Sequence, residues 1–423
     1  MYCSKIANSP LSICEEFDND MGNIIFGAVH HHFKDGKCSE CGASQGVFGN
    51  RQGLENHAYA FIHSDRDDVF GELLTMKFDV IIGNPPYQLD DGGAGASAKP
   101  IYHLFVEQAK KLNPQFLIMI TPSRWFTGGK GLDAFRDSML NDKRMRKIVD
   151  FIDSKECFPS SADISGGVSY FLWDKNYNGD CLIENMENCI AISSMERPLL
   201  EENSNVFIRF NKSISILRKS KKFNEPSFSK LVSSRKPFGF ETSYKGFNQS
   251  KERTIQLHTS NGIKYVGKND ILRNYEWVDD YKVYIARAYG ERISSEFWVL
   301  GKPFLGEPNT ACTETYLVIG NFENEQICQN VMSYIRTRFF RFLVLLKKNT
   351  QDGTSKVYEF VPMQDFSQSW TDDKLYAKYG LSKDEIAFIE KMVREMPDES
   401  IIPEKKIRSK KLKQADLLEG GDE

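Results

Sequence analysis

Residues 77–88 read Lys-Phe-Asp-Val-Ile-Ile-Gly-Asn-Pro-Pro-Tyr-Gln. The first part of this stretch, Lys77–Gly83, is a compact apolar run with β-branched residues, which is typical of a strand buried on both faces. Two consecutive prolines then stop the strand and fix the backbone, because each proline ring restricts φ. The stretch therefore places Asn84 and Tyr87 just beyond the carboxyl end of a buried strand.

The segments that follow alternate between helix and strand patterns. Pro100 opens a helix with apolar residues at helical spacing, and Leu132–Leu140 continues as another helix. Further buried strands are predicted at Phe116–Ile120, Lys147–Asp153, Val168–Trp173 and Cys181–Asn185. This alternation predicts an α/β fold with a doubly wound sheet, whose functional site lies at the carboxyl ends of the strands.

Composition excludes several classes of protein. The 423 residues are 40% hydrophobic and 27% charged, with a mean hydropathy of −0.45. No segment approaches the roughly 18 uncharged apolar residues of a membrane span, and the first residues lack the regions of a signal peptide. The nine scattered cysteines do not have the pattern of a disulfide scaffold. We therefore expect a cytoplasmic protein of two or three domains with no membrane partner.

Positive charge is concentrated in one part of the chain. The whole chain carries a net charge of −3, but Val206–Lys302 holds 19 Lys/Arg against 9 Asp/Glu, together with 16 aromatic residues. Basic side chains neutralise phosphates and aromatic rings stack on bases, so this composition is typical of a nucleic-acid-binding surface. A solvated face over an ordinary core would have the same composition.

Asn84-Pro85-Pro86-Tyr87 fits the chemistry of amine methylation. An exocyclic amine on a heteroaromatic ring is a poor nucleophile because its lone pair is delocalised, so it needs acceptors for its N–H groups. Asn84 can supply a side-chain carbonyl, and Pro85 a main-chain carbonyl that the two fixed φ angles hold in place. Tyr87 offers a flat face on which an extruded base can stack. Positioning accounts for most of the acceleration, and no acid or base with a perturbed pKa is required.

Phe78–Gln88 resembles the catalytic motif of adenine-N6 DNA methyltransferases of the type IIG/type III restriction–modification group, which have the Eco57I-like methylase domain. The similarity covers most of residues 1–195 and continues more loosely beyond them. Its other segments are Asp91–Gly95, Pro100–His103, Phe105–Ala109, Pro122–Phe126 and Gly166–Trp173, then loosely Tyr358–Pro362 and Trp370. The resemblance implies S-adenosylmethionine as methyl donor, a flipped adenine of double-stranded DNA as acceptor, and a restriction subunit as a further partner.

The resemblance also implies roles for individual residues. Asn84 and Pro85 are the acceptors for the adenine amine, Pro86 holds the turn, and Tyr87 is the stacking platform. An aromatic residue within Tyr170–Trp173 covers the other face of the base.

The cofactor site departs from the family pattern. In the family it begins with a turn resembling Asp-Pro-x-x-Gly-x-Gly, and the 423 residues contain no such turn. We therefore expect a second polypeptide or a missing N-terminal region to complete the methyltransferase fold, and poor cofactor binding by the chain alone. Asp79 is a weak candidate for positioning the cofactor, and a strand-end aspartate that satisfies loop amides is an equal interpretation.

Cysteines and histidines near the N-terminus have the spacing of a metal site. Cys38 and Cys41 are separated by two residues, and His57 and His63 follow after 15 and five further residues. This spacing fits a Cys2His2 zinc site, and a cysteine-containing hairpin with surface histidines is the alternative. From the family resemblance we favour His31 and His57 as the other two ligands, with His63 as substitute, and expect zinc to be structural.

Together these observations predict a partial Rossmann-like methyltransferase sheet followed by an α+β target-recognition domain. The expected regions are an N-terminal segment with a zinc knuckle (1–76), the catalytic half of the methyltransferase domain (77–195), a linker helix (196–225), the DNA-binding target-recognition domain (226–370), and a helix with a disordered basic tail (371–423). Helices are expected at Phe207–Lys222, Glu325–Leu346 and Asp384–Met396.

The expected function is site-specific DNA adenine-N6 methylation, as the modification part of a restriction–modification system. Two other functions stay open. Similar turns serve protein-glutamine and RNA methyltransferases, which usually lack a large aromatic, basic domain after the sheet. The missing cofactor turn leaves a non-catalytic DNA-binding or specificity protein as the other alternative.

Overall fold

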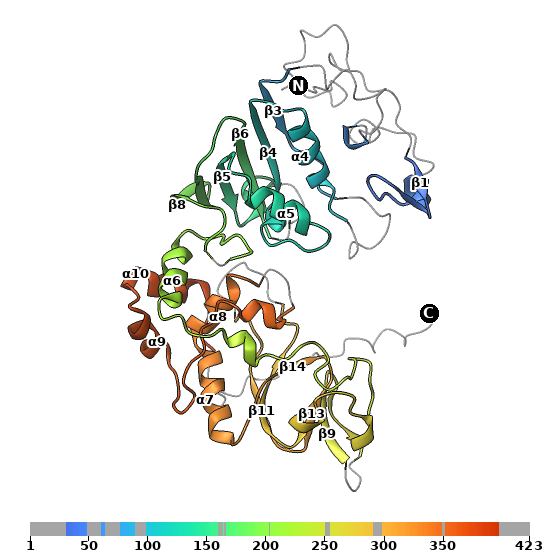
Figure 1. The fold of residues 1–423 in the computed structure, drawn as a ribbon, viewed down its shortest axis with the longest axis vertical. Coiled ribbons are helices and arrows are strands. Elements are labelled where there is room, and N and C mark those ends of the chain that lie inside the picture. The colour runs from blue at the N-terminus through green and yellow to red at the C-terminus, as the bar shows by residue number, and fades with distance from the viewer. Residues whose placement is uncertain are drawn as a thin grey trace, which may run out of the picture.

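The computed structural model describes residues 31–48, 61–63, 77–88, 99–159, 164, 166–202, 204–249, 254–290, 298–348 and 352–396. Figure 1 shows two units joined end to end, one built on a six-stranded sheet and the other on two three-stranded sheets with helices around them. The first unit also carries a small hairpin and a short helix: β1 (Phe33–Lys34), β2 (Lys37–Cys38) and α1 (Gln45–Phe48).

The sheet of the first unit contains β3 (Val80–Gly83), β4 (Phe116–Pro122), β5 (Met145–Phe151), β6 (Val168–Asp174), β7 (Cys181–Glu187) and β8 (Ile190–Arg197). The strand order is β3-β4-β6-β5-β7-β8. Strand β3 is parallel to β4, and β5 is parallel to β7, whereas β6 runs antiparallel between β4 and β5. The carboxyl ends of β3, β4, β5 and β7 therefore share one edge of the sheet.

The strands of this sheet can be compared with the predicted ones. All five predicted strand segments lie in the sheet, so a mixed α/β structure is confirmed. The sheet is mixed, because β6 is antiparallel to both of its neighbours, and the Rossmann-like, doubly wound arrangement stays a prediction. Strand β8 was not predicted: it follows β7 after a two-residue turn in which Asn188 and Cys189 have φ of 53° and 61°. Such turns suit hairpins, but cysteine rarely adopts positive φ, so the sequence carries no clear turn signal.

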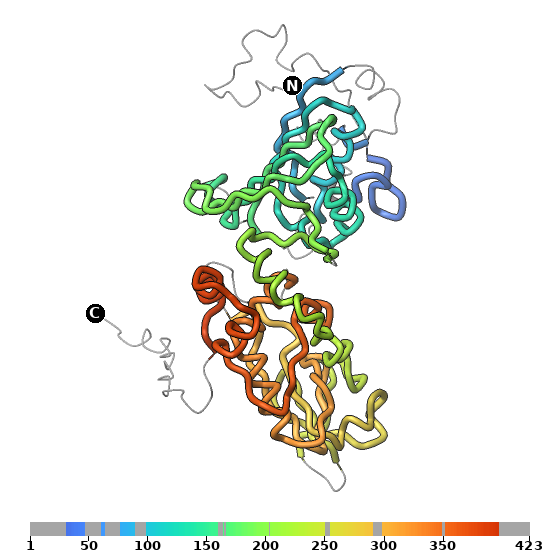
Figure 2. Tube along the Cα trace, turned by 60° about the vertical axis from the view of Figure 1, so that its left-hand side comes forward, coloured from blue at the N-terminus to red at the C-terminus, as the bar shows by residue number. Residues whose placement is uncertain are grey.

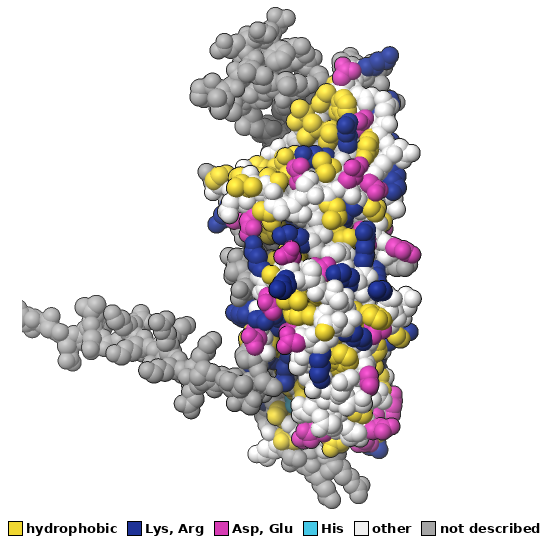
Figure 3. Space-filling model, turned by 90° about the vertical axis from the view of Figure 1, so that its left-hand side faces the viewer, with side chains coloured by type: hydrophobic (Ala, Val, Ile, Leu, Met, Phe, Trp, Pro, Cys, Tyr) yellow, Lys and Arg dark blue, Asp and Glu magenta, His cyan; other side chains and the backbone are white. Residues whose placement is uncertain are grey.

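The two faces of this sheet differ. Helices on one face are α4 (Tyr102–Lys111) and α5 (Asp133–Leu140). They pack against buried strand residues such as Leu117 and Phe171. Alternate strand residues point to the opposite face, where Val80, Ile82 and Tyr170 are 48%, 69% and 38% exposed. In Figure 3, hydrophobic side chains gather on the upper part of the face that is displayed. An apolar area thus stays exposed on the sheet beside β3.

The second unit combines strands and helices. Its sheets have the orders β10-β9-β13 and β12-β11-β14. The strands are β9 (Thr254–Thr259), β10 (Gly262–Gly267), β11 (Tyr281–Ala286), β12 (Phe304–Gly306), β13 (Thr310–Cys312) and β14 (Tyr316–Phe322). The helices are α6 (Lys212–Lys221), α7 (Glu325–Arg336), α8 (Arg338–Leu345), α9 (Asp372–Tyr379) and α10 (Lys383–Met392).

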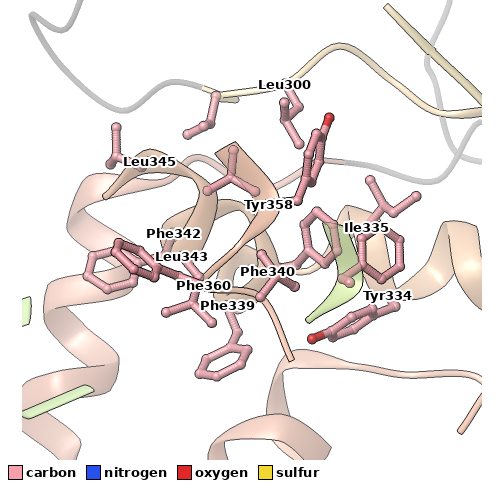
Figure 4. Close-up of a cluster of buried hydrophobic side chains, with 14 of the residues drawn as sticks. Leu300, Tyr334, Ile335, Phe339, Phe340, Phe342, Leu343, Leu345, Tyr358 and Phe360 are labelled. Atoms are coloured by element: carbon pink, nitrogen blue, oxygen red, sulfur yellow. The ribbon is translucent and has the colours of Figure 1, made fainter. Parts of the chain in front are cut away.

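Helix α8 lies at the centre of a large buried core. Aromatic side chains of this core are drawn in Figure 4: Phe339, Phe340, Phe342, Tyr358 and Phe360. The single helix predicted over Glu325–Leu346 is two helices, because Thr337 is extended (ψ 147°) and ends α7. Its side chain then accepts a hydrogen bond from the Phe340 N–H and caps α8, which is a common role of threonine.

Helices α6 and α10 lie at the junction of the two units (Figures 1 and 2). Lys219 of α6 pairs with Glu385 of α10 at 2.7 Å, and Lys391 of α10 pairs with Glu187 of β7 at 3.1 Å. Both helices are shorter than predicted, and the predicted basic tail lies outside the described residues. In the described part of the chain, no helix has the length and apolar character needed to cross a membrane.

Candidate active site

The Asn84–Tyr87 motif forms the loop at the carboxyl end of β3. Asn84 is exposed to solvent, whereas Pro85 is buried. The backbone N–H of Ile101, just before α4, donates a hydrogen bond to the carbonyl of Tyr87 over 3.2 Å. The loop is therefore held by β3 at one end and by the start of α4 at the other, while the Asn84 side chain faces solvent.

The ring of Tyr87 is held by aromatic neighbours. It meets Tyr102 of α4 edge-on at 6.5 Å and Phe158 at 6.3 Å between ring centroids. Its hydroxyl is buried and has no hydrogen-bond partner among the described residues. Burial, with Cys157 as a smaller cause, raises the pKa of Tyr87 to about 12. The hydroxyl is therefore a protonated donor at neutral pH, and packing sets the orientation of the ring.

The structure separates the three aromatic residues of Tyr170–Trp173. Phe171 and Trp173 are each 1% exposed and belong to the core beneath α4 and α5. Tyr170 is 38% exposed and points to the opposite, open face. Of these three rings, only Tyr170 can meet a ligand without rearrangement of the core.

Strand register places Asn84 and Tyr170 on the same row of the sheet. Gly83 pairs with Met119 across β3 and β4, and Ile120 pairs with Tyr170 across β4 and β6. Asn84, one residue beyond Gly83, is therefore level with Tyr170 and two strands away. At about 4.8 Å per strand, their backbones lie roughly 10 Å apart.

A buried ion pair joins the edge of the sheet at which the parallel strands end to the predicted linker segment, 196–225. The sequence analysis did not identify this pair. Asp150, near the end of β5, accepts hydrogen bonds from Arg209 Nε at 2.5 Å and Nη2 at 2.8 Å, and from Ser123 Oγ at 2.9 Å. Arg209 Nη1 also donates to the carbonyl of Gly166 at 2.7 Å. The sequence feature that could have indicated this pair was the carboxylate of Asp150 inside the apolar segment Lys147–Asp153.

The turn before β6 requires glycine. Gly167 has a φ of +76°, and a Cβ there would lie 2.1 Å from the carbonyl oxygen of Phe151 and 2.5 Å from that of Ile152. Gly167 therefore packs directly against the backbone at the end of β5, which leaves no space for a side chain at this position.

Asp79 lies at the other end of β3 from Asn84, roughly 16 Å away along the strand. Its side chain is exposed, and its backbone carbonyl accepts a hydrogen bond from the Phe116 N–H at 2.8 Å. The structure therefore does not bring Asp79 together with the Asn84–Tyr87 loop.

Four predicted metal-ligand candidates converge near α4. The ligand atoms of His31, Cys38, Cys41 and His63 all lie within 4.8 Å of one another. His57, the fourth ligand predicted first, lies outside the described residues. Burial raises the pKa of the Cys41 thiol to about 12 and lowers the pKa of His31. This grouping includes His63, which the sequence had offered as the substitute ligand.

The basic segment divides into ion-paired and solvent-exposed side chains. Ion pairs join Arg218 to Glu201, Lys219 to Glu385, Arg235 to Glu314 and Lys236 to Glu241. Around the β9–β10 hairpin, exposed basic and apolar side chains form what we term the hairpin surface: Lys245, Phe247, Ile263, Lys268, Leu272 and Arg273. Part of the charge excess thus balances acidic groups within the fold, and part faces solvent.

Comparison with known proteins relates the chain to methylases. Residues 2–158 match the family model of the Eco57I restriction-modification methylase. An uncharacterized adenine-specific methylase of Mycoplasma pneumoniae is 39% identical over 179 residues, which are 40% of this chain and 42% of that protein. The chain thus spans less than half the length of this curated relative.

Solved structures with similarity to this chain include restriction–modification enzymes. The type IIG restriction endonuclease BpuSI is 13% identical, with a TM-score of 0.32 over 75% of this chain and 50% of that chain. The type IIL enzyme MmeI, solved in complex with DNA, is 11% identical, with a TM-score of 0.37 over 66% and 45%. The matched family segment contains Asn84-Pro85-Pro86-Tyr87. Residues 2–158 therefore match the Eco57I restriction-modification methylase model over the region where the motif resembles that family.

Proposed function

We propose that this chain is the catalytic and DNA-recognising part of a site-specific adenine-N6 DNA methyltransferase, the modification part of a restriction–modification system. One observation carries the proposal. Within the methylase-matching segment, one proline-fixed loop at the carboxyl end of β3 carries an exposed Asn84 and a half-buried Tyr87. S-adenosylmethionine is the methyl donor that this family implies.

In the proposed reaction, two acceptors meet the amine at adenine N6. The side-chain carbonyl of Asn84 and the main-chain carbonyl of Pro85 accept its two N–H groups, which favours a tetrahedral nitrogen with a localised lone pair. N6 then forms a bond to the methyl carbon as the C–S bond breaks, and the electron pair of that bond remains on sulfur as a thioether. The extra proton on N6 leaves afterwards to water. Preorganised acceptors of this kind act through positioning and electrostatics.

Two tyrosines serve as platforms for the flipped adenine in this proposal. Tyr87 follows the acceptor loop, and Tyr170 is exposed on the same row of the sheet as Asn84. Stacking of a base on an aromatic ring contributes about 1–3 kcal/mol, which helps to offset the free energy of unstacking the base from DNA.

The described residues fit only part of a site for S-adenosylmethionine. They include the Asn84–Tyr87 loop that we propose faces the base, but they include no glycine-rich turn after a strand that could hold the methionine and ribose. Among the described strands, β3 lies at one edge of its sheet, and it exposes Val80 and Ile82. We propose that a second polypeptide or an N-terminal region pairs with β3 and carries this turn. Full burial of each side chain would contribute about 1.5–3 kcal/mol, which supports docking at this edge.

The hairpin surface is the proposed DNA contact. Its lysines and arginine would neutralise phosphates, and its exposed apolar side chains would contact the grooves. The recognition sequence and an associated restriction subunit belong to the same proposal and rest on the family alone.

The identity of the methylated product tests the proposal. The chain is mixed with a complementing cofactor-binding part, labelled S-adenosylmethionine and duplex DNA, and the digested DNA is analysed by mass spectrometry. We expect label in N6-methyladenine, and none when glutamine peptides or RNA replace the DNA. Label in glutamine or RNA would transfer the function to the alternative acceptors. DNA binding without methyl transfer under any complementation would favour a non-catalytic specificity protein.

A further inference from the structure

Two cysteine sulfurs and two histidine nitrogens face one another beside the start of α4. Cys38 Sγ lies 3.4 Å from His63 Nε2, and Cys41 Sγ lies 3.4 Å from His31 Nδ1. All four ligand atoms lie within 4.8 Å of one another, although they come from three separate stretches of the chain, around residues 31, 38–41 and 63. Two separate hydrogen bonds between a cysteine and a histidine would not require the two pairs to face each other, whereas one shared metal ion would.

The separations fit tetrahedral coordination of one ion. Zinc binds cysteine sulfur at about 2.3 Å and histidine nitrogen at about 2.0 Å, so a sulfur and a nitrogen of a tetrahedral site lie about 3.5 Å apart. Both sulfur–nitrogen distances given above, 3.4 Å, agree with this value. Two thiolates and two imidazoles form a donor set that favours zinc over the oxygen-preferring ions magnesium and calcium.

The backbone around the cysteines is already shaped as a knuckle. The Cys38 carbonyl accepts a hydrogen bond from the Gly42 N–H at 2.9 Å, and the Cys38 N–H donates to the Ala43 carbonyl at 2.8 Å. Gly42 has a φ of +77°, which a glycine adopts without strain. The Ser39 N–H donates to the His32 carbonyl at 2.9 Å and so fixes the segment that carries the first histidine. Both cysteines are therefore oriented toward the same point before any ion binds.

We propose that His31, Cys38, Cys41 and His63 bind one structural zinc ion. Cys38 and His63 are each 3% exposed, Cys41 is fully buried, and His31 is partly buried. Four protein ligands fill a tetrahedral zinc ion and leave no position for a substrate, which assigns the ion to stability and not to the methylation chemistry.

The site stabilises the start of α4. Cys38 and Cys41 share a small core with Ile101 and Phe105, and Phe61, two residues before His63, stacks on Phe105 at 6.0 Å. The ion therefore joins the hairpin and the Phe61–His63 segment to α4, and the N-cap residue of this helix, Ile101, holds the Asn84–Tyr87 loop. Metal binding does not depend on the proposed function. Only the effect of the metal on the Asn84–Tyr87 loop rests on that proposal.

Metal content of the tag-free full chain tests the proposal. After dialysis against metal-free buffer, plasma mass spectrometry should find about one zinc ion per chain. Cys41→Ser and His63→Asn should lose most of it, whereas the matched controls Cys189→Ser and His32→Asn should retain it. His57→Asn should also retain zinc.

Cobalt titration keeps the test independent of whether the variants fold. Wild-type chain with its metal removed should develop the visible bands of tetrahedral cobalt and the thiolate-to-cobalt charge-transfer band at one equivalent. Zinc loss in His57→Asn with retention in His63→Asn would overturn the ligand set. Absence of zinc together with absence of these bands, or a disulfide between Cys38 and Cys41 in the freshly purified protein, would overturn the site.

Discussion

The buried Asp150–Arg209 pair allows a quantitative prediction about the sheet edge. The Asp150 carboxylate is fully buried, and it accepts two hydrogen bonds from Arg209 and one from Ser123. Asp150→Ala would leave the guanidinium, whose side chain is only 19% exposed, without its anion. Removing one partner of a buried pair costs about 3–5 kcal/mol, so we expect the free energy of unfolding of the N-terminal unit to fall by about this amount.

Urea unfolding combined with hydrogen exchange of β5 and β6 peptides measures this loss. Asp137→Ala is the matched control, because Asp137 pairs with Arg136 at 2.8 Å but its side chain is 61% exposed, and such a pair contributes about 0–1 kcal/mol. Replacing Asp150 and Arg209 together with apolar residues should recover part of the loss. A loss for Asp150→Ala no larger than that of the control would refute the reasoning.

Three further predictions concern the base platform, the DNA surface and pH. Tyr170→Ala should lower kcat/KM for DNA methylation by roughly 10–100-fold while Tyr170→Phe retains activity, because the ring supplies the stacking; steady-state kinetics decide this. The three basic side chains of the hairpin surface are Lys245, Lys268 and Arg273. Replacing all three by Gln should reduce the slope of log K for DNA binding against log salt concentration by about 2–3, because three phosphate contacts are lost. A fluorescence titration measures this slope, and Lys383→Gln is the control that should leave it unchanged. Burial, with Lys99 as a smaller cause, lowers the pKa of His103 from 6.5 to about 4. Between pH 6.5 and 4 the unfolded chain therefore binds more protons than the folded chain, so the free energy of unfolding falls as pH drops through this range. The unfolding temperature of His103→Phe should lack this contribution to the pH dependence.

Features set by local sequence could be predicted. Apolar runs bounded by proline or glycine identified the strands of the N-terminal sheet, and Asn84-Pro85-Pro86-Tyr87 identified the loop at the end of β3. The direction of β6 could not be predicted in the same way, because it depends on pairing with β4 and β5 far along the chain. The break between α7 and α8 was readable in principle from Thr337, which caps the second helix.

The candidate site shows the same division. The sequence offered three aromatic residues for the second face of the base, and only the strand register and burial show that Tyr170 is the exposed one of the three. Asp150 and Arg209 are 59 residues apart, so no local pattern reports their contact. Cys38 and Cys41 were recognised from their short spacing, whereas the position of His63 beside them depends on the packing of its segment against α4.

The rate of a single turnover with Asn84→Ala tests the central claim most directly. Methyl transfer is measured with the complemented enzyme in excess over a duplex that carries the recognition sequence, and DNA affinity is measured alongside. Removal of one preorganised acceptor should lower the rate constant by about 10²–10³-fold and leave the Kd for DNA unchanged. A rate constant equal to that of the wild-type enzyme would contradict the proposal that the Asn84 carbonyl accepts a hydrogen bond from the adenine amine.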